Sequence, residues 1–507
     1  MATLKDFRDE RLRKLAELKA LGVDPYPASA RRTTKLAGLL ADFDNLASQK
    51  AVVTVAGRIK SIRKFGKIAF IVIRDDQAEL QLFLKHDGLA SPDRADSQLA
   101  FTDLSLLDSG DFLEASGVVA PTQTGEQSVV VSTMRLLTKS LRPLPNDQEG
   151  FTNKEERLRR RYVDTNVNPD VFQRYIRRSR FWQATRDFLL QNDFLEINIP
   201  VLESIAGGAD ANPFVTHMDA LDQDFYLRIS HELPLKRLLV GGYEKVFDIG
   251  PRFRNENYSD EHLPEHVAME WYWAYANWEM GMALSEQLVR QVADSTWGKR
   301  QFTFLNGHKI DLGADGEHWP RLSFPVLIQD TFAIDIFNTS LVEVQPILKA
   351  NAIELEKSDN LPRCIDKLWK KIRTGIAGPA FLVDIPTFLQ PLAKTQPSKP
   401  HLTEQFNLIL GGTEACKAYS ELNDPIDQLN RFKEQQAMRD AGDAEAQMMD
   451  IDYVEALEYG MPPACGFGYS ERLFWLLEGV TAREGVPFPQ LRTGIDETTK
   501  AIDPSLE

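Results

Sequence analysis

The sequence predicts an α+β protein in which a small five-stranded β-barrel comes first and a larger domain follows, built on an antiparallel sheet flanked by helices. Three observations predict this fold. The chain has 507 residues, which is too many for a single hydrophobic core. Between residues 51 and 141, short runs with β-strand character follow one another, separated by Gly and Asp. Beyond them, strand-like runs mingle with helical ones without the regular alternation of a doubly wound sheet.

The composition is that of a folded protein, with 43% hydrophobic and 26% charged residues. Lys and Arg total 59 against 74 for Asp and Glu, so any contact with nucleic acid must be local in a chain of net charge -15. No stretch approaches the roughly 20 apolar residues that span a bilayer, and the first residues are charged rather than signal-like. We therefore expect no membrane contact and a cytoplasmic location.

The three cysteines lie far apart, at Cys364, Cys416 and Cys465, and predict neither a disulfide framework nor a zinc site.

The barrel prediction rests on five segments that follow a leader helix over residues 6–21. The expected strands are 52–62, 68–74, 80–84, 112–119 and 129–137. Five short strands in this length are typical of an oligonucleotide-binding (OB) barrel. Cations gather on two of them beside aromatic residues: Arg58, Lys60, Arg63, Lys64 and Lys67 lie next to Phe65 and Phe70. That combination is typical of single-stranded nucleic-acid binding, although a solvated charged strand pair is the alternative.

A proline-containing segment, 142–156, reads as a linker. We place the domain boundary within it, giving domains of residues 1–148 and 149–507. The second domain is expected to contain helices over 171–190 and 278–292. Its extended runs are expected at 194–202, 225–229, 245–249 and 406–410.

The second domain has neither a GxxxxGK[ST] loop nor a GxGxxG turn, so side chains must bind any nucleotide. The segment FRNE, at 253–256, follows a strand-like run and presents Arg254, whose guanidinium can bind two phosphate oxygens. The segment GFGYSER, at 466–472, is predicted to be a glycine-rich turn that presents Arg472 at the start of a helix. Two such arginines could neutralise a triphosphate.

With these motifs in place, the chain resembles a bacterial-type class II lysyl-tRNA synthetase over nearly its whole length. The three class motifs match 194–200 with its preceding helix, 253–270 and 466–472. Longer blocks also match: GGADANPF from Gly207, YLRISHELPLKRLLVGG from Tyr226, AYSELNDP from Ala418 and ALEYGMPP from Ala456. The resemblance implies an OB anticodon-binding domain, a class II catalytic domain, the substrates ATP, L-lysine and tRNA-Lys, Mg²⁺ with the ATP, and a homodimer.

The resemblance also implies roles for individual residues. Arg254 would hold the ATP α-phosphate and the amino-acid carboxylate, and Arg472 the γ-phosphate, as the two catalytic residues. Lysine would contact Gly207, Glu232, Glu270, Tyr272, Lys417, Tyr419 and Glu421. ATP would contact Glu256, His262, His266 and Glu414 beside the two arginines, and the metal would be held by Glu414 and Glu421. The anticodon would contact Arg63, Phe70, Gln81 and Glu126, with Phe70 stacking a base.

Physical reasoning supports the lysine pocket separately, because buried carboxylates need a cation to remain ionised, and lysine brings one at its far end. No covalent catalysis by a side chain is needed. For Phe70, composition alone favours a core aromatic, so its anticodon role depends on the resemblance.

Several positions depart from the family pattern. His266 stands where a phenylalanine usually stacks on adenine, and the third motif is one residue short and lacks its third glycine. Asn407 replaces a glutamate near the metal, and Lys417 replaces an asparagine near the substrate carboxylate. One acid is lost and one cation gained, so we expect fewer tightly held metal ions than the family's three. Asn212, where arginine is common, has no explanation.

Three alternatives share parts of this pattern. Aspartyl or asparaginyl enzymes share the barrel and the catalytic fold, but their substrates do not call for three carboxylates. A lysyl transferase acting on elongation factor P lacks the barrel. A degenerate relative could bind lysine or tRNA without aminoacylation, and lysine-dependent pyrophosphate exchange would distinguish it.

Overall fold

The computed structural model describes residues 3–145, 151–256, 259–356, 359–442, 446–495, 497–502 and 505. The chain forms two compact units. The first comprises residues 1–157, 162–167 and 491–507, and the second comprises 158–161 and 168–490. The predicted domain boundary after residue 148 lies outside the described residues and remains a prediction. The prediction assigned residues 491–507 to the second domain, but they group with the first unit, where α16 (Glu497–Ile502) lies against α1 (Leu4–Ala20).

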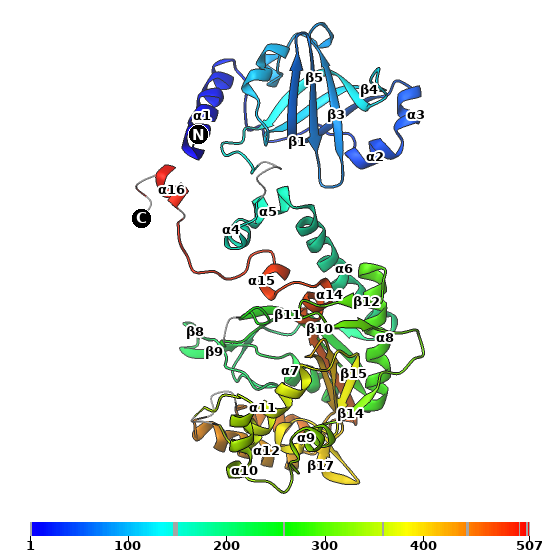
Figure 1. The fold of residues 1–507 in the computed structure, drawn as a ribbon, viewed down its shortest axis with the longest axis vertical. Coiled ribbons are helices and arrows are strands. Elements are labelled where there is room, and N and C mark those ends of the chain that lie inside the picture. Colours follow the sequence, from blue (N-terminus) through cyan, green and yellow to red (C-terminus); the bar gives the residue numbers. More distant parts are fainter. Residues whose placement is uncertain are drawn as a thin grey trace. The chain divides into compact units, whose positions relative to one another are not determined.

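The first unit is built on a closed barrel with the strand order β1-β2-β3-β5-β4 (Figure 1). Its strands are β1 (Val52–Phe65), β2 (Ile68–Arg74), β3 (Glu79–Lys85), β4 (Phe112–Pro121) and β5 (Gln127–Thr138). All five expected strands are present, and four are a few residues longer than expected. The predicted small OB-type barrel is therefore confirmed.

Alternation along the strands decides which side chains fill the barrel. On β2, Ala69, Ile71 and Ile73 are fully buried in the core, so Phe70 between them points outward and is half-buried. The first unit contains the helices α1, α2 (Leu36–Ala41), α3 (Phe43–Ser48), α16 and, except for Arg161, α5 (Arg161–Val167), while the residues of α4 (Lys154–Arg159) are divided between the two units after Arg157.

An eight-stranded sheet, ordered β14-β15-β18-β19-β20-β11-β10-β6, forms the centre of the second unit. Its strands are β6 (Leu195–Glu196), β10 (Lys245–Phe253), β11 (Glu265–Ala274), β14 (Arg321–Ser323), β15 (Ala380–Val383), β18 (Gln405–Leu410), β19 (Thr413–Ser420) and β20 (Ala464–Ser470). Only the edge pairs β10–β6 and β14–β15 are parallel, which confirms the predicted antiparallel character. The expected extended run over 194–202 is shorter, since only two of its residues join the sheet.

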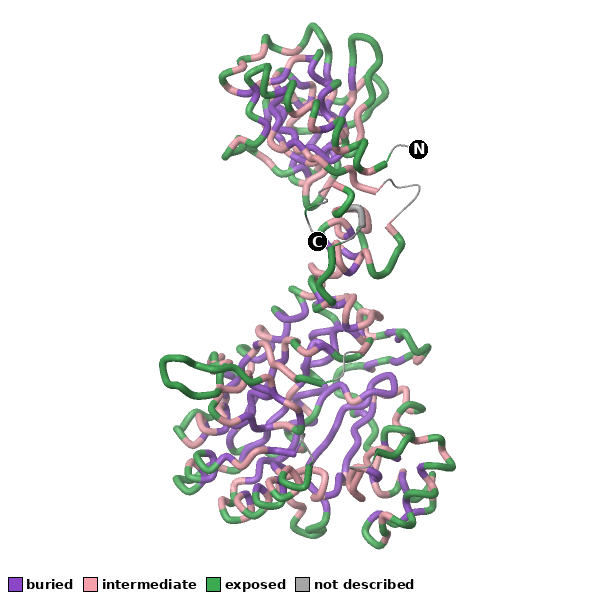
Figure 2. Tube along the Cα trace, turned by 90° about the vertical axis from the view of Figure 1, so that its left-hand side faces the viewer, coloured by how far each residue is buried: buried purple, intermediate pink, exposed green. Residues whose placement is uncertain are grey.

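Buried residues follow the strands of this sheet (Figure 2), and they belong to different clusters on its two faces. Trp271 and Phe467 pack towards α6 (Pro169–Gln191) and α8 (Trp278–Trp297) in the largest core. On the other face, Tyr272 of β11 and Tyr419 of β19 pack with residues of α7 (Glu232–Val240) and α13 (Ile451–Glu458). The second face carries the cavity described below.

The remaining elements surround this sheet. The helices are α9 (Phe324–Phe332), α10 (Leu341–Ala350), α11 (Leu361–Arg373), α12 (Pro425–Asp440), α14 (Glu471–Glu478) and α15 (Ala482–Gly485). Smaller sheets are formed by β7 (Leu202–Glu203), β8 (Val215–Met218) and β9 (Gln223–Leu227), by β12 (Gln301–Thr303) and β13 (Lys309–Asp311), and by β16 (Thr395–Gln396) and β17 (Lys399–Thr403). Within the described ranges, no helix is both long and apolar enough to cross a bilayer.

Candidate active site

A cavity of about 320 Å³ lies over the central strands β10, β11, β20 and β19. Most residues predicted to bind lysine line it: Glu232, Glu270, Tyr272, Lys417, Tyr419 and Glu421, with Arg254, Glu414 and Arg472. Gly207 is not among the lining residues, whereas Gly208 is. A Cβ at Gly207 would lie 2.6 Å from Leu233 Cδ1, so this glycine allows close packing against α7.

Glu270 lies on β11 and is held by several donors. Ser230 Oγ donates to its carboxylate at 3.0 Å, Tyr272 OH at 3.1 Å and the His231 amide at 3.2 Å. Arg252 Nη1 on the next strand lies 3.5 Å from the same carboxylate. These contacts fix one buried anion at the side of the cavity.

Glu232 and Glu421 form a second buried group around Lys236. Lys236 Nζ is 2.5 Å from Glu232 Oε1 and also pairs with Glu421, and Tyr419 OH donates to Glu232 at 2.6 Å. Burial alone would lower the pKa of Lys236. The two carboxylates Glu232 and Glu421 outweigh burial, so the pKa lies well above its usual value. Burial raises the pKa of Glu421, and the adjacent Lys236 ammonium opposes that rise. The predicted carboxylate cluster therefore contains a cation of the protein itself.

Two glycines on β20 create the space between these side chains. Gly466 stands between Tyr272 and Tyr419 in the register, and Gly468 between Glu270 and Lys417. A Cβ on Gly466 would lie 2.3 Å from both Glu421 Oε1 and Tyr272 Cε1. The predicted glycine-rich turn is therefore wrong: residues 464–470 form a strand, and its glycines are needed because side chains of the site occupy the space above them.

A second cavity, of about 100 Å³, adjoins the first. It is lined by Glu256, His262 and His266, as predicted for the ATP site, and it shares Arg252, Arg254, Ser470 and Arg472 with the first cavity. In the described part of the chain, neither Arg254 Nε nor Arg472 Nε has a hydrogen-bond partner, although both atoms are buried. Two donors without partners thus lie where the two cavities meet.

Arg472 is placed there by the junction of β20 and α14. Ser470 caps the helix by accepting from the Arg472 amide, and Glu471 accepts from Arg178 Nε of α6 at 2.6 Å. Burial lowers the pKa of Arg472. The carboxylate of Glu261 opposes this shift, and the nearby cation Arg373 adds to it. Arg373, at the end of α11, is a neighbouring cation that sequence reasoning missed.

His266 is a neutral imidazole in this arrangement. Arg252 Nε donates to His266 Nε2 at 2.8 Å, so the remaining ring proton sits on Nδ1, 3.2 Å from the Leu263 carbonyl oxygen. Burial, helped by Arg252 and Arg254, holds its pKa well below the usual value. An uncharged flat ring in the second cavity can stack on a base, as phenylalanine would.

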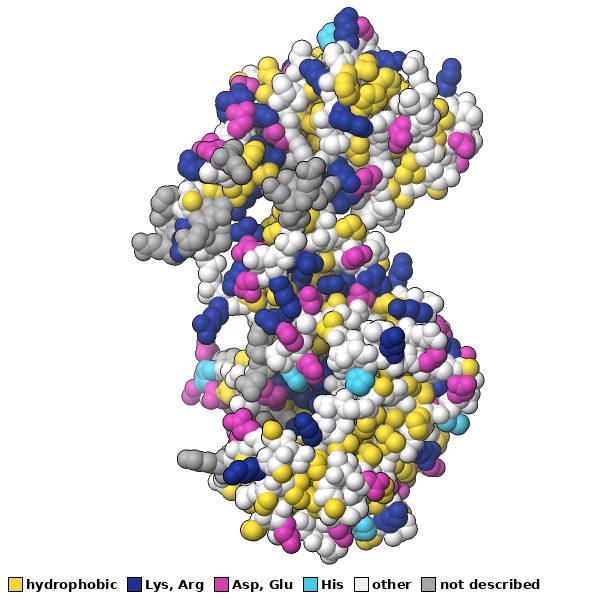
Figure 3. Space-filling view, in the orientation of Figure 1, with side chains coloured by type: hydrophobic (Ala, Val, Ile, Leu, Met, Phe, Trp, Pro, Cys, Tyr) yellow, Lys and Arg dark blue, Asp and Glu magenta, His cyan; other side chains and the backbone are white. Residues whose placement is uncertain are grey.

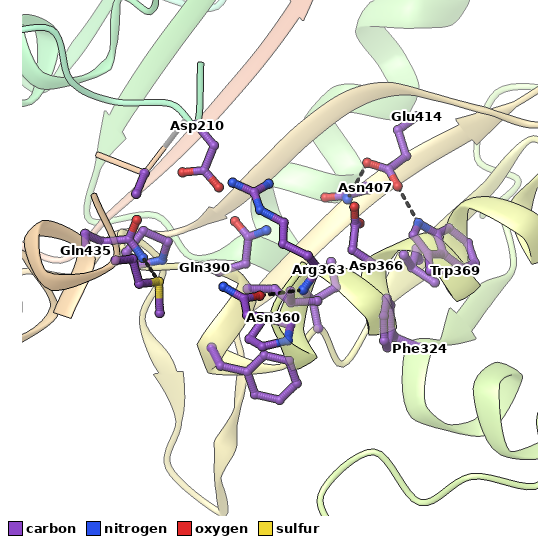
Figure 4. A pocket seen from close by; sticks show the side chains of 18 residues that line it. Asp210, Phe324, Asn360, Arg363, Asp366, Trp369, Gln390, Asn407, Glu414 and Gln435 are labelled. Carbon is purple, nitrogen blue, oxygen red and sulfur yellow. Dashed lines mark hydrogen bonds between the residues drawn. The ribbon is translucent and has the colours of Figure 1, made fainter. Parts of the chain in front are cut away.

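Glu414 lines both the first cavity and a side cavity of about 140 Å³, in which it lies beside Asn407 and Trp369 (Figure 4). Trp369 Nε1 donates to one of its oxygens, and Asn407 Nδ2 donates to the other at 3.1 Å. The partner of Glu414 is thus the amide of Asn407, at the position where the family pattern has a glutamate. Across the described ranges, no three His, Cys, Asp or Glu side chains gather as a metal cluster.

Sequence reasoning missed several residues of the site: Gly208, Ser230, Lys236, Arg252 and Arg373. Only Lys236 carried a local signal, since it follows Glu232 by four residues on a helix, a spacing at which ion pairs form. The others depend on strand pairing or on distant segments.

The four residues predicted to contact an anticodon lie together on the barrel. Arg63, Phe70, Gln81 and Glu126 line an open groove of about 820 Å³, with Phe65 and Thr122. Phe70 stacks on Phe83 with ring centroids 5.1 Å apart, and Gln81 Nε2 donates to Ser128 Oγ at 3.0 Å. Hydrophobic side chains flanked by Lys and Arg are visible on the barrel surface (Figure 3). The outward position of Phe70 thus disfavours the interpretation that its ring is part of the barrel core.

Comparison with known proteins agrees with this arrangement. Residues 153–492 match the family described as tRNA synthetases class II (D, K and N), and residues 53–137 match the OB-fold nucleic acid binding domain. The chain belongs to the class II tRNA synthetases of this group.

Similar proteins named "Lysine--tRNA ligase" narrow the comparison further. One from Roseiflexus castenholzii is 41% identical, covering 96% of this chain and 99% of that protein. Those of Fervidobacterium nodosum and Thermotoga maritima are 39% and 38% identical over 96% of this chain, covering 94% and 96% of their own lengths.

Proposed function

We propose that this protein is a lysine–tRNA ligase. It activates L-lysine with ATP to lysyl-adenylate and pyrophosphate, and then transfers the lysyl group to the 3′ end of tRNA-Lys. The observation that carries the proposal is a cavity with three buried carboxylates, Glu232, Glu270 and Glu421, that opens beside two arginines with unpartnered buried Nε atoms. Such a cavity suits an amino acid with an ammonium group at each end and a triphosphate next to it.

The proposed chemistry needs alignment and charge neutralisation rather than a covalent residue. A lysine carboxylate oxygen attacks the α-phosphorus, and the bond to pyrophosphate breaks. Arg254 holds the α-phosphate and the carboxylate, and Arg472 the γ-phosphate. A tRNA ribose hydroxyl then attacks the adenylate carbonyl carbon, and AMP leaves.

The other predicted roles are consistent with this chemistry. Glu232 faces the α-ammonium, and Tyr272 and Glu421 face the side-chain ammonium, with Glu270 and Tyr419 in the same pocket. Glu256 lies at the adenine, and His266 stacks on it within the second cavity.

Pyrophosphate exchange with each amino acid separately tests the function. Exchange that depends on lysine, followed by charging of tRNA-Lys, is the expected result. Exchange with aspartate or asparagine instead would refute the lysine assignment. Binding of lysine without any exchange would favour a degenerate relative that does not catalyse aminoacylation. The presence of both Arg254 and Arg472 argues against that alternative.

Mg²⁺ is the expected metal, and the residues present fit an ion held mainly by phosphate and water. Glu414 offers carboxylate oxygens at the cavity wall, each of which has a lone pair beyond its present hydrogen bond. The ion would supply neutralisation of phosphate charge. Glu421, also predicted as a ligand, is paired with Lys236.

The number of ions is proposed to be lower than the family's three. Lys417 is exposed in the cavity and lies opposite Asn407 and Gly468 in the register, so its ammonium adds a positive charge where an acid is absent. Lys417→Asn is expected to weaken ATP binding about fivefold and to raise the Mg²⁺ requirement, since one nearby charge is worth about 1 kcal/mol. Lys399→Asn, at an exposed lysine on β17, is the control. Unchanged ATP affinity and Mg²⁺ dependence would refute the idea.

The barrel, as part of domain 1–148, is proposed to bind the anticodon, and domain 149–507 to catalyse both steps. Phe70 stacks a base, while Arg63, Gln81 and Glu126 contact base edges and backbone. Because tRNA charging serves translation, we place the enzyme in the cytoplasm, which cell fractionation can test.

A homodimer is also proposed. Exposed apolar side chains lie at one end of the strands near the β6 edge: Leu195 is 49% exposed, Tyr243 46% and Tyr275 68%. Exposed apolar groups together are typical of a protein interface. Light scattering should give twice the chain mass, and a monomer at micromolar concentration would refute this.

A further inference from the structure

Lys236 is a lysine buried behind the amino-acid cavity. Its side chain is 0% exposed, and its Nζ lies 5.6 Å and 5.8 Å from the ring centroids of Tyr419 and Tyr453. It is not among the residues that line the cavity, whereas Glu232 and Glu421, its two ion-pair partners, are. Its ammonium therefore reaches the cavity through side chains that line it, chiefly these two carboxylates and the ring of Tyr419.

The two carboxylates come from different parts of the fold. Glu232 begins α7, while Glu421 directly follows β19. Two buried anions repel each other and stay close only with a cation between them. Within the described residues, Lys236 is the one cation ion-paired with Glu421. Glu270, by contrast, is held by Ser230, Tyr272 and Arg252 without Lys236.

Lys236 contacts one oxygen of Glu421, Oε2, and leaves the other oxygen, Oε1, without a donor. In the described structure, Oε1 is buried and has no hydrogen-bond partner. A buried carboxylate oxygen without a donor is costly, so Oε1 is ready to accept a hydrogen bond from a ligand. One Glu421 oxygen faces the space above Gly466, inside the cavity.

We propose that Lys236 is a positioning residue that holds Glu232 and Glu421 at the separation needed to receive both ammonium groups of lysine. This inference rests on the proposed function and deepens it. Loss of the Lys236 charge would let the carboxylates separate, which weakens ground-state and transition-state binding of lysine equally. The effect should therefore appear in KM for lysine rather than in kcat.

The test uses Lys236→Met in the full chain, assayed by lysine-dependent pyrophosphate exchange. KM for lysine should rise about 50-fold or more, while kcat changes less than about threefold and KM for ATP is unchanged. The matched control is Arg237→Met, on the same helix. Arg237 pairs with Asp450, and neither residue lines the cavity, so KM for lysine should stay at the wild-type value.

A double-mutant cycle separates positioning from a general structural role. In the Glu421→Gln background, Lys236→Met should raise KM for lysine less than about fivefold, because one of the two anions it holds is gone. The double variant leaves no additional unpaired charge from this pair, so it remains informative if the single variant does not fold. An equal rise in both backgrounds, or an unchanged KM in Lys236→Met, would overturn the inference.

Calorimetric titration of lysine into the same four proteins should reproduce the pattern without catalysis. Lack of lysine-dependent exchange in the wild type would refute the proposed function, whereas the calorimetric cycle would still decide the role of Lys236.

Discussion

The amino-acid cavity and the barrel groove use charge in opposite ways. In the cavity, Glu232, Glu270 and Glu421 are at most 5% exposed. In the groove, Arg63 and Glu126 are exposed, and Phe70 and Gln81 are half-buried. The barrel buries charge elsewhere, as the pair Lys139 and Asp111, whose Nζ and Oδ2 lie 2.8 Å apart. A small charged ligand is selected by desolvated partners, whereas a long polymer is gripped at an accessible surface.

Filling the cavity should therefore have the largest effect on activity. Gly466→Ala would place a Cβ 2.3 Å from Glu421 and Tyr272, which must move. Because displacements of about 1 Å in a site can cost roughly 100-fold in rate, we expect lysine activation to fall by about 100-fold or more. Pyrophosphate exchange measures this. Gly494→Ala is the control, since no neighbouring atom of the described chain lies within 4 Å of its added Cβ. Near-normal exchange in Gly466→Ala would mean that the packed cavity is not the lysine site.

Removing an aromatic ring from the groove should have a smaller and separate effect. Phe70→Ala loses a stacking surface worth about 1 to 3 kcal/mol per base, so KM for tRNA should rise about 5- to 150-fold. Exchange without tRNA should be unchanged. Phe7→Ala, at an exposed ring on α1, is the control in the same unit. If Phe70→Ala altered exchange but not KM for tRNA, the contrast between the two regions would fail.

The two regions also differ in what their sequences could predict. The barrel strands were predicted to within a few residues because one face fills a core, so apolar and polar residues alternate along the chain. The strand at 464–470 was mistaken for a turn because its glycines leave space for the side chains of Tyr272 and Glu421, and these two residues are distant in the sequence. Local spacing could pair Lys236 with Glu232 but not with Glu421. Local motifs singled out Arg254 and Arg472 one at a time, but no local pattern brings the two together, so their separate roles at one nucleotide came from the family resemblance.

The smallest expected effect concerns a buried carboxyl outside the cavity. Burial raises the pKa of Glu203 to about 8, and in the described structure one of its buried oxygens has no hydrogen-bond partner. An unfolded glutamate titrates near pH 4.3, so between that pH and about 8 the folded protein retains a proton that the unfolded chain releases. Stability should therefore fall as pH rises through this window.

Glu203→Gln removes this pH-dependent cost. We expect it to stabilise the second unit by about 1 to 3 kcal/mol at pH 8 and to change nothing at pH 4, with lysine activation unaltered. Thermal unfolding at the two pH values measures the difference, with Glu455→Gln at an exposed position of α13 as the control. An equal change in Tm at both pH values would show that Glu203 acts through packing rather than through its charge.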